Sequence, residues 1–192
     1  ICIGNVYWVF DGYHSSIVRY DFAVPHEIGG HDHSDGKVWR YDEIDITRAE
    51  GIPSHMVLDD DSDFLYIADT GNQRILRFNV NSGNYSHDLS PYGESLAEYF
   101  MIENAEWEIF INQYLEKPSG IDMYNNRLVV SDYSSGNIIF YDISISPPVE
   151  IGRIDTGYQN NIMGIKIDSN QKIWYVDYQN NNVVRIDYSL MN

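Results

Sequence analysis

The sequence repeats one short pattern four times, an apolar run that ends in an aspartate. Six residues after each aspartate stands a second branched aliphatic residue, Ile17, Ile75, Ile138 or Val183. A unit that recurs along a chain buries its apolar face by stacking on its neighbours, so the pattern restricts the chain to a repeat architecture. It constrains the fold without naming a function. The four runs are Tyr7–Asp11, Leu65–Asp69, Leu128–Asp132 and Ile173–Asp177.

Each copy predicts two β-strands joined by a tight turn. The runs are rich in Val, Ile, Tyr and Trp, which favour strands, and the residues that follow supply Gly, Asn and Ser for the turn. A carboxylate at the end of a strand can accept hydrogen bonds from backbone N–H groups of such a turn. We therefore interpret the four aspartates as structural residues, with a metal-binding or catalytic role as the alternative; they are Asp11, Asp69, Asp132 and Asp177.

Further strand-like segments complete the unit. They precede three of the copies, at 53–59, 118–123 and 162–168, and follow the copies at 37–43, 106–113 and 149–154. Four strands per repeat predict an all-β propeller of antiparallel blades. We expect one propeller domain over 1–192, with a partial blade at 1–50, blades at 51–115 and 116–156, and a partial blade at 157–192.

Two segments interrupt this pattern, at 22–36 and 84–105. Leu96, Phe100 and Met101 fall near helical spacing, which predicts a short helix within 90–103 that packs on the rim. The acidic run 59–63 lacks the bend glycine and the final glutamate of a calcium loop, so we interpret it as a solvated turn.

Neither end of the chain supplies a whole blade. Residues 1–4 run directly into the first repeat, and no outer strand is evident after Tyr188. We expect a piece of a larger ring, because open strand edges invite association. A small ring closed by the two partial blades, and a ring made by two chains, are the alternatives.

The blade segments resemble the NHL-repeat β-propellers. The residues that carry the resemblance are Pro118-Ser119-Gly120-Ile121-Asp122 and the run from Leu65 to Ile75, which contains Ala68-Asp69. In that family the inner strand begins at Pro-x-Gly and the next strand ends in Ala-Asp. The resemblance implies an NHL-type propeller of about four visible blades that belong to a six-bladed ring.

Within that family, Val9–Val18 is similar to a segment of the peptidyl-hydroxyglycine amidating lyases. The similarity implies that Tyr13 is a catalytic residue and that His55 is a zinc ligand. The family places its ligand directly after proline, where this chain has Ser54. The other inner strands carry Ser119 and Met163 at the ligand positions.

Propeller topology groups the candidate ligand-binding residues. The starts of the inner strands and the loops after the aspartates lie at one end of a propeller channel, and a propeller mouth is a place where ligands bind. We therefore expect one face that carries Tyr13 and His55 together with the ligand-binding candidates His14, Tyr133 and Tyr178.

A second candidate site lies in the segment His26–Gly36, which holds three of the six histidines and three carboxylates. Imidazole and carboxylate together suit Zn²⁺ and related ions. His31, His33 and Asp35 are the first choices as ligands for Zn or Ca, with His26 next. The alternative is a turn-rich connection without a metal. Topology predicts that this segment lies at the face opposite to Tyr13.

The net charge is −17, from 12 basic and 29 acidic residues. This balance excludes nucleic acid as a partner, because such binding needs a basic footprint. It also disfavours an anionic membrane surface, and no apolar run approaches the ~18 residues of a membrane span. An acidic surface is compatible with an extracellular or periplasmic medium, which we favour. The single cysteine rules out an internal disulfide.

Two functions remain open at this point. The first is a propeller that acts as a scaffold and binds a small ligand, a peptide or a protein at its mouth. The second is a metal-dependent lyase or hydrolase similar to the amidating lyases, with Tyr13 as base and His55 as a metal ligand. The ligand positions occupied by Ser119 and Met163 favour the scaffold.

Overall fold

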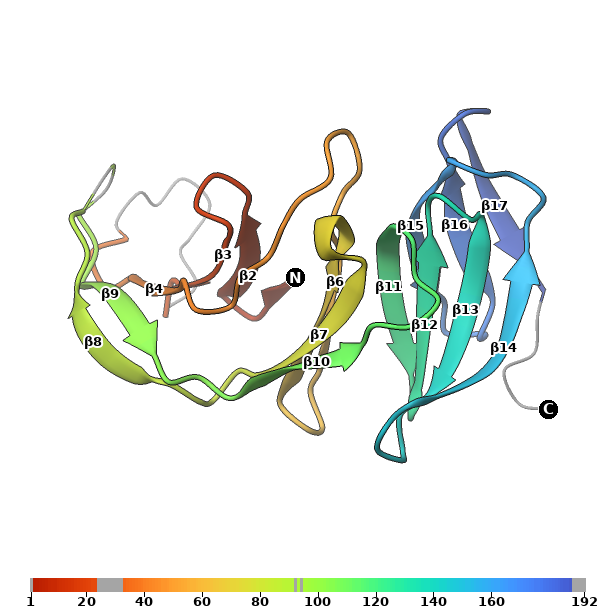
Figure 1. Ribbon diagram of the computed structural model, residues 1–192. Helices are drawn as coiled ribbons and strands as arrows, with labels where there is room; N and C mark the ends of the chain where they lie inside the picture. The colour runs from red at the N-terminus through yellow and green to blue at the C-terminus, as the bar shows by residue number, and fades with distance from the viewer. Residues whose placement is uncertain (1, 24–32, 92, 94, 188–192) are drawn as a thin grey trace. The chain divides into compact units, whose positions relative to one another are not determined.

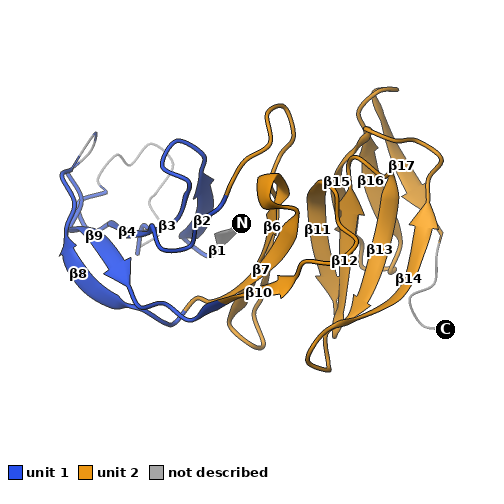
Figure 2. Ribbon diagram, in the orientation of Figure 1, with its two compact units in different colours: residues 1–46, 81–107 blue, residues 47–80, 108–192 orange. Residues whose placement is uncertain are grey.

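The computed structural model describes residues 2–23, 33–91, 93 and 95–187, and the side chains from Gly4 onward. Strands dominate this part of the chain, with one short 3-10 helix (Figure 1). The strands form two compact units, coloured separately in Figure 2. Unit 1 comprises residues 1–46 and 81–107, and unit 2 comprises residues 47–80 and 108–192. In the part described, no helix is both long and apolar enough to span a bilayer.

Unit 1 is built on one six-stranded sheet. Its spatial order is β1-β2-β3-β4-β9-β8, and all neighbours are antiparallel except β4 and β9. The two-residue strand β1 pairs with β2, so a short inner strand does precede the first repeat, contrary to expectation. The bounds are β1 (Cys2–Ile3), β2 (Val6–Asp11), β3 (Ser16–Asp21), β4 (Lys37–Tyr41), β8 (Asn84–Asp88) and β9 (Glu98–Glu103).

The helix predicted within 90–103 is wrong, because Glu98–Glu103 forms strand β9. This strand runs parallel to β4, with Phe100 opposite Trp39. Glu98 anchors the pairing: its Oε2 accepts a hydrogen bond from Trp39 Nε1 at 2.8 Å, and its Oε1 lies 2.8 Å from Lys37 Nζ. Tertiary pairing and the aromatic content of the segment outweigh its weak helical spacing.

Unit 2 contains three sheets, in which β5 to β7, β11 to β14 and β15 to β17 each pair antiparallel with their neighbours in the chain. Two have four strands, in the orders β10-β7-β6-β5 and β11-β12-β13-β14, and the third is β15-β16-β17. The first sheet has β5 (Met56–Asp59), β6 (Phe64–Asp69), η1 (Thr70–Asn72), β7 (Arg74–Asn79) and β10 (Trp107–Ile111). The others have β11 (Pro118–Tyr124), β12 (Arg127–Asp132), β13 (Asn137–Asp142), β14 (Val149–Asp155), β15 (Ile162–Ile167), β16 (Ile173–Asp177) and β17 (Asn182–Ile186).

The four repeat aspartates occupy equivalent positions. Each is the last residue of the second strand of its sheet, and each lies opposite the first residue of the next strand. The pairs are Asp11 with Ser16, Asp69 with Arg74, Asp132 with Asn137 and Asp177 with Asn182. The repeat read from the sequence is therefore a repeat of strand register.

The core of unit 2 lies between neighbouring sheets. Ile75 and Val130 belong to a cluster shared by the first and second sheets, and Ile138 and Ile165 to one shared by the second and third. Full burial of such a side chain contributes about 1.5–3 kcal/mol. Gly120 permits the close approach of β11 to β15, because a Cβ there would lie 2.6 Å from the backbone nitrogen of Ile165.

Candidate functional site

The strand-end aspartates of unit 2 act as clamps on the adjacent loops. Asp132 is fully buried, and its carboxylate accepts backbone hydrogen bonds from Glu116 (2.7 Å), Lys117 (3.1 Å) and Ser135 (3.0 Å). One side chain thereby joins the connection before β11 to the loop between β12 and β13. These bonds occupy the carboxylate oxygens, as the structural interpretation predicts.

The other two aspartates of unit 2 follow the same plan with different partners. Asp69 accepts the backbone N–H of Thr47 at 2.8 Å and the Nε–H of Arg74 at 2.7 Å. Asp177 accepts the backbone N–H of Asn180 at 3.0 Å and the side-chain amide of the same residue. Hydrogen bonds from Asn180 lower the pKa of Asp177 below its ordinary value and outweigh the opposing desolvation. The charged form of Asp177 is therefore the one that holds this loop.

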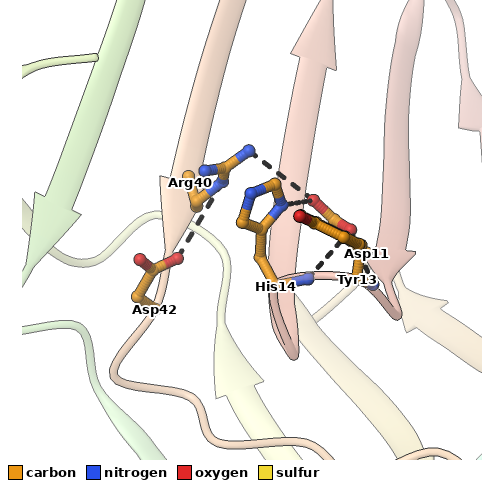
Figure 3. A network of polar contacts seen from close by, with 5 residues as sticks. All are labelled: Asp11, Tyr13, His14, Arg40 and Asp42. Carbon is orange, nitrogen blue, oxygen red and sulfur yellow. Dashed lines mark hydrogen bonds and ion pairs between the residues drawn. The ribbon is translucent and has the colours of Figure 1, made fainter. Parts of the chain in front are cut away.

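In unit 1 the equivalent aspartate organises a polar network (Figure 3). Asp11 Oδ1 accepts the backbone N–H groups of Tyr13 (3.0 Å) and His14 (3.2 Å), and Oδ2 lies 2.6 Å from His14 Nδ1. Arg40, from β4, places Nη2 3.5 Å from the same Oδ2 and Nε 3.9 Å from Asp42. Figure 3 shows the imidazole and the guanidinium on the same side of the Asp11 carboxylate.

Partial burial acts to raise the pKa of Asp11, but hydrogen bonds from the His14 ring and from the backbone of His14 and Tyr13 outweigh it and lower the pKa. A carboxylate that stays ionised can orient an imidazole through Nδ1 and leave Nε2 for a ligand. Tyr13 is 90% exposed, and its ring meets His14 edge-on with the centroids 4.7 Å apart. The catalytic role of Tyr13 and the ligand-binding role of His14 stay predictions.

His55 lies in unit 2, directly before β5, and it is half-buried. Its Nδ1 is 2.8 Å from the carbonyl oxygen of Ser119, which its backbone N–H also contacts at 3.1 Å. Its ring lies beside Gly164: a Cβ built on that glycine would be 3.6 Å from Nε2. One ring nitrogen is thus held by the neighbouring inner strand, and Nε2 is the atom that a metal ion could use.

The second predicted metal site falls largely outside the described residues, where His26 and His31 lie. His33 is described, and its ring packs on Phe22 with the centroids 5.0 Å apart. Its carbonyl closes a turn with the N–H of Gly36 at 2.8 Å, and Asp35 lies within that turn. In the part of the chain with assigned positions, no three His, Cys, Asp or Glu side chains are grouped as metal ligands. His33 and Asp35 remain predicted ligands.

The predicted common face divides between the two units. Tyr13 and His14 belong to unit 1, and His55, Tyr133 and Tyr178 belong to unit 2. Within unit 1, the loop that follows Asp11 and the segment near His33 lie at opposite ends of the hairpin formed by β2 and β3. Asp11 pairs with Ser16 at one end, and Val6 pairs with Asp21 at the other. The residue after Asp21 is Phe22, whose ring contacts His33.

Within unit 2, Tyr133 and Tyr178 are joined through one residue. The buried Asn161 donates its backbone N–H to the Tyr133 carbonyl at 3.2 Å and accepts the N–H of Tyr178 at 3.2 Å. Its side-chain oxygen accepts the N–H of Gln179 at 2.8 Å. Three loops, which follow β12, β14 and β16, are thereby linked by hydrogen bonds.

Of this linked surface, here called the amide–tyrosine rim, only Tyr133 and Tyr178 were predicted. It consists of Tyr133 and two copies of Tyr-Gln-Asn-Asn, at 158–161 and 178–181. The copies interlock, because the Gln179 amide donates to the carbonyls of Gln159 (3.2 Å) and Asn160 (3.0 Å). Tyr158 is 49% exposed and Tyr178 is 56% exposed. The duplicated tetrapeptide is the sequence signal that could have revealed it.

Comparison with known proteins identifies the fold. No family model and no curated protein matches the sequence. Among solved structures, the chain is similar to one in the "Crystal structure of Nidogen/Laminin Complex", with a TM-score of 0.55, 15% identity, and coverage of 89% of this chain and 53% of that chain. A second match is the computationally designed Ika8 protein, with a TM-score of 0.36, 9% identity, and coverage of 89% of this chain and 55% of that one.

The chain thus spans about half the length of the structures that it matches. The nidogen/laminin match and the meandering antiparallel sheets together show an all-β propeller fold.

Proposed function

We propose that this propeller is a scaffold that binds a polypeptide partner through the amide–tyrosine rim. The observation that carries the proposal is the hydrogen-bonded pair of Tyr-Gln-Asn-Asn loops, which presents Tyr158 and Tyr178 beside exposed amides. Tyrosine supplies a large contact area at low conformational cost, and Asn supplies adaptable hydrogen bonds. Such a surface suits the mixed polar and apolar character of a polypeptide.

Two properties of the rim support this role. The first is rigidity: the bonds made by Asn161 and Gln179 order the loops before a partner arrives, which reduces the entropy lost on binding. The second is charge: the rim side chains are neutral Tyr, Gln and Asn on a chain of net charge −17. A neutral patch lets an uncharged segment bind without burying an unpaired charge.

The similar solved structure is a complex of nidogen with laminin, so its fold occurs in an assembly of proteins. The Pro118–Asp122 and Leu65–Ile75 motifs support placement of this propeller with the NHL-repeat family. The metal-dependent lyase similar to the amidating lyases is the alternative function. It is favoured by the His55 imidazole, which is held through Nδ1, and by the His14 imidazole that Asp11 orients.

The test of the scaffold is selection of a random-peptide phage library on the immobilised chain. We expect the wild-type chain to enrich peptides, and we expect Tyr158→Ser/Tyr178→Ser to weaken their binding by about 10-fold or more, since buried interface tyrosines are frequent hot spots. The matched control is Ile145→Ser/Ile151→Ser, which changes residues that are 51% and 48% exposed elsewhere in unit 2. It should change affinity less than 2-fold.

The proposal fails if no peptide is enriched, or if the rim variant binds the selected peptides as well as the wild type does. The lyase alternative has its own measurement, the zinc content of protein purified without chelator. Stoichiometric zinc that is lost in His55→Ala would support the lyase, and metal-free protein without lyase activity would remove it.

A further inference from the structure

Unit 2 contains a cavity of about 240 Å³ away from the amide–tyrosine rim. It lies between β10, with the segment that follows it, and the turn that leads into β14. Phe110 and Tyr114 come from the first side, and Pro147, Pro148 and Glu150 from the other. A dry cavity of about 150 Å³ accommodates benzene in another protein. This cavity is therefore large enough for one substituted aromatic ring.

Tyr141, from β13, also lines the cavity, and its hydroxyl is the unusual feature of the site. The side chain is 4% exposed, and its Oη has no hydrogen-bond partner among the described residues. Buried hydroxyl groups are nearly always paired, so an unpaired one calls for an explanation. A bound group that accepts a hydrogen bond from Oη would satisfy it.

Glu150 provides an acceptor next to this donor. It lies opposite Tyr141 in the pairing of β13 with β14. Arg153 holds its carboxylate through two hydrogen bonds, Nε to Oε1 at 2.7 Å and Nη2 to Oε2 at 2.6 Å. Burial, and then the negative charge of Glu150, raise the pKa of Tyr141. The hydroxyl therefore stays protonated and remains a donor at neutral pH.

We propose that this cavity binds a phenol: the ring contacts Phe110, Tyr114 and the two prolines, while its hydroxyl accepts a hydrogen bond from Tyr141 and donates one to Glu150. A hydroxyl is the simplest group that can do both. An anionic ligand is disfavoured by Glu150 and by the net charge of −17. The phenol can belong to a free small molecule or to a tyrosine side chain of a peptide.

The test is a titration of the chain with p-cresol, toluene and N-acetyl-tyrosinamide, followed by NMR chemical shifts. We expect p-cresol to bind saturably and more tightly than toluene. Tyr141→Phe should lower the affinity for p-cresol at least 5-fold and the affinity for toluene less than 2-fold, since only the hydrogen bond is removed. Glu150→Ala, which removes the acceptor, should show the same selectivity.

Tyr141→Phe should not lower the melting temperature, because it deletes a buried hydroxyl that has no partner among the described residues. Binding of both p-cresol and N-acetyl-tyrosinamide assigns the site to a tyrosine side chain, and binding of p-cresol alone assigns it to a free small phenol. The proposal is overturned if p-cresol does not bind, if toluene binds as tightly, or if both variants keep the wild-type affinity for p-cresol.

Discussion

The clamp formed by Asp132 makes a quantitative prediction. Its carboxylate is fully buried and accepts three backbone hydrogen bonds, from Glu116, Lys117 and Ser135. A hydrogen bond to a charged group contributes about 1.5–3 kcal/mol, and a buried donor left without a partner costs about 1–3 kcal/mol. Three such bonds are not additive, because water can reach part of a relaxed loop. We therefore expect Asp132→Ala to lower the free energy of unfolding by about 3–5 kcal/mol.

Asp142→Ala is the matched control. Asp142 also ends a strand, β13, but the hydrogen bonds that its carboxylate accepts from described residues come from the N–H and the hydroxyl of Ser144 in its own turn, at 2.9 and 2.6 Å. An exposed local turn of this kind contributes less, so we expect a loss below about 1 kcal/mol. Both variants lie in unit 2 and differ mainly in how many segments the carboxylate joins.

Equilibrium unfolding in urea measures both losses. Far-UV circular dichroism and the fluorescence of Trp174, which lies on β16 of the same unit, should report a lower midpoint for Asp132→Ala with little change in slope. If Asp132→Ala loses less than about 1 kcal/mol, or no more than Asp142→Ala does, the clamp contributes little to stability. The repeat aspartates would then need another explanation.

Two further predictions concern packing and pH. Gly120→Ala should lower the melting temperature strongly, because its Cβ would lie 2.6 Å from a backbone nitrogen of β15. The control Gly164→Ala should be tolerated, because its Cβ would lie 3.6 Å from the His55 ring. Equal melting temperatures of the two variants would contradict this prediction. For Glu98, desolvation raises the pKa, but hydrogen bonds from Lys37 and Trp39 outweigh it and lower the pKa below 4.5. Its contribution to stability is therefore present above pH 4.5 and lost as the pH falls through the folded-state value. Urea midpoints of the wild type and Glu98→Gln should converge on acidification; a constant difference would refute the pairing.

Much of the fold could be predicted from the sequence because the repeat encodes strand register. Ile75 and Ile138, both spaced from their aspartates in the same way, are fully buried. The outcome differs at Val183, which is 66% exposed on β17, the edge strand of a three-stranded sheet. The spacing indicates which face of the strand a residue lies on, but it does not indicate whether another sheet packs on that face.

The insertion at 84–105 could not be read in this way. Its two strands extend the six-stranded sheet of unit 1 beyond β4, and a parallel pairing between segments about sixty residues apart leaves no local spacing to detect. The candidate site shows the same limit. Sequence reasoning found Tyr133 and Tyr178, but the hydrogen bonds through Asn161 and the cavity beside the Tyr141 hydroxyl depend on contacts between strands that are distant in the chain.

Strand β8 ends the sheet of unit 1, and its composition controls what can be added there. It reads Asn-Tyr-Ser-His-Asp, is mostly exposed, and its pairing with β9 shifts register between Tyr85 and His87. An irregular, polar border is a poor template for another strand, whereas a flat apolar border recruits other chains. The insertion thereby caps the row of unpaired backbone groups that β4 would otherwise present, and it limits the growth of this sheet into aggregates.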